Sequence, residues 1–85
     1  MKAIVTISAR SNWAGNRYFI FKLSGRETVA EIDIIPGGGF RVFGYSTDGY
    51  ITRRTKAGAF NLAKKQVREF LDRCGDTREI EFINA

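Results

Sequence analysis

Apolar and polar residues alternate through much of the first half of the chain, a pattern typical of strands with one buried face. Residues 3–8 are rich in β-branched side chains, and residues 17–23 and 28–34 alternate. The short polar segment 24–27 lies between the last two and predicts a turn. We therefore expect the two alternating segments to form an antiparallel hairpin.

The alternation also assigns the two faces of this hairpin. Glu31 and Asp33 are expected on the outer face together with Val29, because their positions alternate with those of the apolar residues. Two carboxylates so placed can meet in the fold, but such residues more often form a solvated strand surface. The buried face is expected to carry Phe19, Phe21, Leu23, Ala30, Ile32 and Ile34.

Turn signals divide the next segment of the chain. Residues 36–39, Pro-Gly-Gly-Gly, interrupt the pattern, and residues 40–45 then predict a strand with apolar residues on both faces. Residues 46–49 end in Asp-Gly, a favoured pair for a type I′ turn, so residues 50–54 are expected to return as a short strand. The triple glycine leads into a strand, whereas phosphate-binding loops usually lead into a helix, and we interpret it as a hairpin connection.

Residues 56–74 show the 3, 4, 7 apolar spacing of an amphipathic helix. Thr55 is the predicted N-cap, and Gly75 is placed where a left-handed residue ends a helix. Gly58 in the first turn lowers helix stability. The apolar face is expected to comprise Phe60, Ala63, Val67, Phe70, Leu71 and Cys74.

The predicted fold is therefore α+β in a single domain, residues 1–85. Residues 78–83 alternate charged and apolar side chains and should rejoin the sheet after the helix. The element order is β-β-β-β-β-α-β, a mainly antiparallel sheet of five to six strands with one long helix packed on one face. A chain of 85 residues with 44% hydrophobic residues and one proline has the composition of a small globular domain.

The composition argues against catalysis. The chain has no histidine, which removes the commonest general base and metal ligand, and its single cysteine, Cys74, has no histidine partner. We expect Cys74 to be a small buried hydrophobe rather than a reactive thiol. The sequence also contains no zinc-type spacing and no phosphate-binding Walker loop. We therefore expect no enzyme activity, no metal and no cofactor.

Positive charge is concentrated in one segment. The net charge is +5, and residues 41–68 carry seven basic residues against one acidic residue, whereas residues 69–85 carry two against five. Segregated positive charge attracts polyanions, and interleaved aromatics stack on bases. The alternative is that the helix cations form an ordinary solvated face and that Phe43 belongs to the core. The predicted nucleic-acid-binding residues are Arg41, Tyr45, Tyr50, Arg53, Arg54, Lys56, Lys64, Lys65 and Arg68.

Residues 40–60, FRVFGYSTDGYITRRTKAGAF, resemble the arm-type DNA-binding domains of phage integrases. Such domains have a basic aromatic hairpin and a Thr-Lys-x-x-Ala-like helix start on a three-stranded sheet that reads the major groove. The resemblance covers about a quarter of the chain, and the expected strand after the helix departs from it. It implies DNA contacts by Arg41, Tyr50, Arg53 and Arg54.

Trp13 lies in the polar loop of residues 9–16 and is a candidate protein-interface residue, because tryptophans dominate interface hot spots. The alternative is that it covers the edge of a thin core.

Two functions remain open from the sequence. The first is a module that binds nucleic acid or a nucleoprotein complex. The second is a protein-interaction module that binds an acidic protein surface, such as a small phage or mobile-element protein that inhibits a host complex in the manner of anti-CRISPR proteins. A small enzyme or oligomeric ligand binder ranks last. The N-terminal residues lack the apolar segment of a signal peptide, and no apolar run is long enough to span a bilayer, so a cytoplasmic protein is expected.

Overall fold

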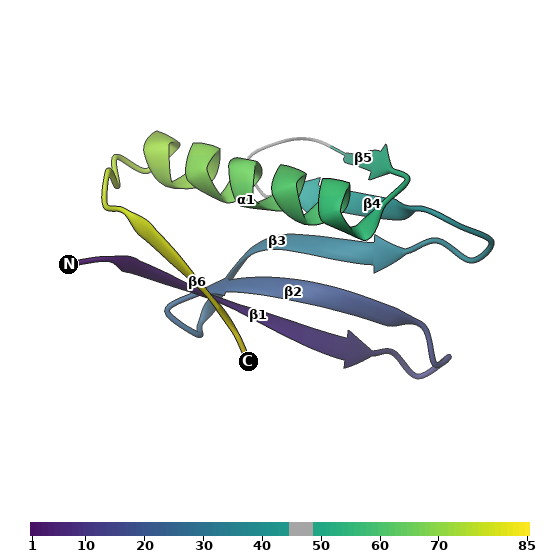
Figure 1. Cartoon of the computed structure of the whole chain (residues 1–85). Helices are drawn as coiled ribbons and strands as arrows, with labels where there is room; N and C mark the ends of the chain where they lie inside the picture. The colour runs from purple at the N-terminus through teal and green to yellow at the C-terminus, as the bar shows by residue number, and fades with distance from the viewer. Residues whose placement is uncertain (45–48) are drawn as a thin grey trace.

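The computed structural model describes residues 1–44 and 49–85 and has the expected α+β architecture. A six-stranded sheet, ordered β5-β4-β3-β2-β1-β6, carries one helix on one face (Figure 1). The opposite face, which no described helix or strand covers, is the uncovered face. Each pair of consecutive strands from β1 to β5 is antiparallel, whereas β6 pairs in parallel with the other edge of β1. The elements are β1 (Ala3–Ser11), β2 (Arg17–Leu23), β3 (Glu27–Ile34), β4 (Phe40–Gly44), β5 (Tyr50–Arg53), α1 (Lys56–Arg73) and β6 (Ile80–Asn84).

Residues 24–26 connect β2 to β3 in a tight turn. Ser24 and Gly25 have φ angles of 53° and 69°, and the Arg26 N–H donates to the Leu23 carbonyl at 3.1 Å. Positive φ at both central positions is the geometry of a type I′ turn, whose twist matches that of the flanking strands. The predicted hairpin is thereby confirmed, and the triple glycine forms the β3–β4 connection. The expected turn at residues 46–49 falls mostly outside the described residues.

A β-bulge in β3 overturns the expected position of Val29. Phe21 pairs with Ala30 and Lys22 with Thr28, which leaves Val29 as an extra residue in the ladder. Val29 and Ala30 are consecutive, and both are completely buried. The strict alternation that put Val29 on the outer face was therefore wrong, because a bulge breaks the two-residue period.

The helix α1 begins and ends close to the predicted residues. Thr55 is the N-cap, with its hydroxyl oxygen accepting from the Gly58 N–H at 3.0 Å, and Gly75 has a φ of 77°. Leu71 is the last buried helix residue, and Cys74 beyond it is exposed. The expectation that Cys74 is buried was wrong, because the C-terminal end of the helix extends beyond the part that the sheet covers.

Aromatic rings fill the space between α1 and the β1–β2–β6 side of the sheet. Phe60 of the helix lies 5.0 Å from Phe19 and 5.8 Å from Phe21, and Phe21 lies 6.3 Å from Phe82, all as ring-centroid distances. On the β4 side, Gly44 leaves room for the helix residue Gln66. No helix in the described part of the chain is long and apolar enough to cross a membrane.

Candidate nucleic-acid interface

The strand register collects basic residues at one end of the molecule. Arg10 pairs with Tyr18, Tyr18 with Asp33, and Asp33 with Arg41, which forms one row across four strands. In the next row outward, Ser11 pairs with Arg17 on one side of the sheet and Phe40 with Arg53 on the other. We define the basic end as the six exposed or partly exposed cations Arg10, Arg17, Arg41, Arg53, Arg54 and Lys56.

The helix start belongs to this end because β5 runs directly into α1. Arg53 closes β5, Arg54 follows it, and Lys56 is the first helical residue. The Lys56 ammonium lies 5.2 Å from the centre of the Phe19 ring and 5.7 Å from that of Phe60. Cation–π contact holds the stem of Lys56 on the aromatic cluster while its charge stays at the surface. The end lies at the right of Figure 1, where the loops after β1 and β3 also gather.

These rows carry four cations, Arg10, Arg17, Arg41 and Arg53, and one carboxylate, that of Asp33. Two ion pairs, between Arg68 and Asp72 and between Arg78 and Asp76, lie at the opposite end. Positive charge therefore predominates at the basic end.

The hairpin residues Arg41 and Tyr50 are brought together on the uncovered sheet face. The Arg41 guanidinium lies 5.6 Å from the centre of the Tyr50 ring, and that ring lies 5.5 Å from the ring of Phe43. Tyr50 is 54% exposed and remains accessible to a ligand. Tyr45 lies outside the described residues.

The remaining helix cations stand apart from this end. Lys64 lies over the Phe82 ring at 5.3 Å, and Lys65 is exposed on the outer side of the helix. The Arg68 guanidinium donates to the Asp72 carboxylate and to the backbone carbonyls of Asp76 and Arg78. Arg68 therefore fastens the helix to the segment that leads into β6, and its donors are engaged within the protein.

The Trp13 loop projects from the basic end. The Asn12 side-chain oxygen accepts from the backbone N–H groups of Ala14 at 2.9 Å and Asn16 at 3.0 Å, which fixes the loop as an Asx turn. Trp13 at its tip is 99% exposed. The alternative that Trp13 covers the edge of the core was therefore wrong, and its role as an interface anchor stays a prediction.

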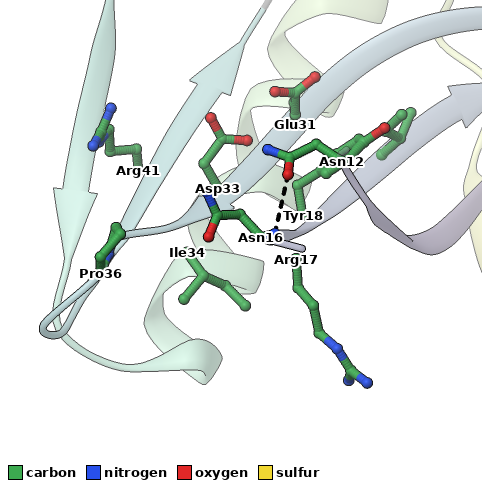
Figure 2. Close-up of a pocket in the computed structure, with 10 residues that line it drawn as sticks. Asn12, Asn16, Arg17, Tyr18, Glu31, Asp33, Ile34, Pro36 and Arg41 are labelled. Carbon is green, nitrogen blue, oxygen red and sulfur yellow. Dashed lines mark hydrogen bonds between the residues drawn. The ribbon is translucent and has the colours of Figure 1, made fainter. Parts of the chain in front are cut away.

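A hollow of about 520 Å³ lies on the uncovered face beside the basic end. Figure 2 shows Glu31 and Asp33 in this hollow, with Tyr18 and Arg41 nearby, and the Arg17 guanidinium directed away from the two carboxyls. Partial burial, a hydrogen bond with Asp33 and the negative charge of Asp33 raise the pKa of Glu31 to about 7. Glu31 is therefore protonated in part of the molecules at neutral pH.

No protein-family model, curated protein or solved structure matches this chain. In the described part of the chain, no three His, Cys, Asp or Glu side chains gather as a metal site.

The sequence pattern alone missed two parts of this surface. Arg10 and Arg17 lie in a segment with only a small positive balance, and they join the basic end through strand pairing rather than through position in the chain. Glu31 and Asp33 were recognised as neighbours on one face, but the hollow around them needs Tyr18 from β2 and Arg41 from β4. Pairing the predicted 17–34 hairpin residue by residue brings Tyr18 next to Asp33, and this is the signal that could have located the hollow.

Proposed function

We propose that this chain is a non-enzymatic binding module that holds nucleic acid at its basic end. The main observation that supports this proposal is the strand register, which places cations from β1, β2, β4 and β5 at the same end of the sheet as the start of α1. Grouped lysines and arginines neutralise phosphates and release counterions, and this supplies most of the affinity of sequence-independent binding.

Aromatic side chains beside the cations support a single-stranded ligand. Tyr18 and Tyr50 lie on the uncovered face, and Trp13 projects from the adjoining loop. Unpaired bases stack on such rings, whereas in a duplex their faces are already occupied. A strand whose phosphates meet the basic end can therefore lay its bases along the uncovered sheet face.

An acidic protein surface, alone or in a nucleoprotein complex, is the second candidate. The observation in its favour is Trp13, a nearly fully exposed aromatic residue among cations. Tryptophan and arginine are the residues most enriched in interface hot spots.

Charge reversal at the two ends of the molecule tests the proposal. We expect Arg53→Glu with Arg54→Glu to weaken binding of a fluorescein-labelled oligonucleotide strongly, as measured by anisotropy. The matched control is Lys2→Glu with Arg26→Glu, which makes the same change in net charge at exposed positions at the opposite end. Circular dichroism and thermal melting check that both variants are folded.

Salt dependence provides a second readout. With four phosphates neutralised on a single strand, affinity should fall roughly fifty-fold between about 50 and about 200 mM salt. Equal loss of affinity in both double variants would show that only net charge matters and would refute the basic end as the site. No binding of DNA or RNA at about 50 mM salt would reject the nucleic-acid proposal and favour the protein partner, whose binding would depend on salt mainly through the association rate.

A further inference from the structure

The hollow on the uncovered face has the size and the mixed polarity of a ligand site. Its volume of about 520 Å³ falls within the range of about 300–1,000 Å³ typical of small-molecule pockets. It is lined by the apolar residue Ile20 as well as by the polar residues Glu31, Asp33 and Arg41. It shares Tyr18, Asp33 and Arg41 with the inner row at the basic end, so a strand held there is within reach of it.

The two carboxyls dominate the chemistry of the hollow. Glu31 and Asp33 alternate on β3, and both side chains point to the uncovered face. In their ionised forms the two carboxyls only accept hydrogen bonds, so a ligand with neighbouring donors is complementary to them. Arg41 on the next strand is paired with Asp33 in the ladder and supplies donors at the side of the same space.

Among the common bases, guanine presents this donor pattern. Its Watson–Crick edge carries the N1–H and the 2-amino group side by side, followed by the O6 acceptor. Uracil and thymine offer one N–H between two carbonyls, and adenine and cytosine each offer an amino group beside an acceptor nitrogen. The edge is free only in an unpaired base, and this is how proteins read sequence in single strands.

Resting on the function proposed above, we propose that the hollow receives one unpaired guanine of a strand held at the basic end. Glu31 and Asp33 accept from guanine N1–H and the 2-amino group, Arg41 donates to O6, and the Tyr18 ring packs against the base. The basic end thus supplies affinity without sequence preference, and the hollow selects the base.

The test compares three labelled single strands of about ten nucleotides: all thymidine, the same strand with one central guanosine, and the same strand with one central inosine. Inosine lacks the 2-amino group and keeps N1–H and O6. We expect the guanosine strand to bind about tenfold more tightly than the thymidine strand, with inosine in between.

The double variant Glu31→Gln with Asp33→Asn should lose this preference. Its affinity for the thymidine strand should stay the same or rise, because negative charge near the phosphates is removed. A purely structural role for the carboxyls does not predict preserved thymidine binding with lost base preference. The control Glu81→Gln, an exposed residue of β6, should retain the preference.

Each outcome separates this inference from the proposed function. Strands that bind without base preference, or a double variant that keeps the preference, would overturn the guanine pocket and leave the basic end standing. A chain that binds none of the strands would reject both proposals. Free GMP should compete for the pocket only weakly, since it lacks the rest of the strand. If GMP bound as tightly as the guanosine strand, the hollow would be a site for a free nucleotide, and the proposal of a strand-bound guanine would be overturned.

Discussion

Replacing Glu31 with glutamine removes a carboxyl group that the fold holds partly out of water, so we expect the variant to be more stable than the wild type above neutral pH. Partial burial and the neighbouring Asp33 raise the pKa of Glu31 from an ordinary 4.5 to about 7. Between these values the native state keeps a proton that the unfolded chain has released. The free energy of unfolding therefore falls as pH rises from about 4.5 to about 7, and the full penalty applies above that range.

The size of the effect follows from the change in pKa. If the whole rise in the pKa of Glu31, from 4.5 to about 7, acted on stability, it would lower the free energy of unfolding by about 3 kcal/mol. Glu31 is only partly buried, and solvent screening reduces this figure to about 1 kcal/mol. In a domain of this length, 1 kcal/mol shifts the melting temperature by roughly 4–8 °C.

The assay is thermal and urea unfolding at about pH 4.5, 6 and 8. The wild type should lose stability across this series relative to Glu31→Gln, and the two should converge at the lowest pH. Glu81→Gln is the matched control, because Glu81 is an exposed carboxylate on the same sheet face. The chain has no histidine, so no imidazole titrates in this window. If Glu31→Gln and Glu81→Gln follow the wild type in parallel at every pH, the inferred burial and pairing of Glu31 are refuted.

Two further predictions concern backbone positions. A Cβ at Gly44 would lie 2.6 Å from Gln66 Oε1 and 2.8 Å from its Cδ, so Gly44→Ala should cost about 1–3 kcal/mol in urea unfolding through overpacking. Most of that loss should disappear in a Gln66→Ala background; an equal loss in both backgrounds would contradict the steric cause. Ser24 has a φ of 53°, which asparagine tolerates better than serine, so Ser24→Asn should raise stability by about 0.5 kcal/mol, and a lower melting temperature would count against the type I′ assignment.

Local patterns predicted the elements well where one physical rule dominates. The strand Arg17–Leu23 and the Thr55 cap match the structure because alternation and capping depend on neighbouring residues alone. Val29 was misplaced because the bulge adds one residue to the ladder, and strict alternation does not predict where that happens. Cys74 was misplaced because helical periodicity does not say where the sheet beneath the helix ends.

Less of the candidate site could be predicted from the sequence, for a related reason. Counting charge along the chain found Arg41, Arg53 and Arg54 but not Arg10 and Arg17, which reach the same end only through the β1–β2 register. The resemblance to integrase arm-type domains stays a prediction. The six-stranded sheet is larger than the three-stranded sheet of those domains, and β6 is the strand that departs most from their pattern.

The parallel pairing of β6 with β1 also has a consequence for the order in which the chain assembles. Val5 pairs with Phe82, so this contact closes nearly the whole chain into a loop, whereas the hairpins between β1 and β5 join close neighbours. Distant contacts form late because the loop entropy is lost before the contact forms. β6 should therefore dock last and open first, and amide hydrogens of β6 exchanging ahead of those in β2 and β3 would record that order. The edge-on contact between Phe82 and Phe21 would then form only in the final step. It would stabilise the folded chain without taking part in the folding nucleus.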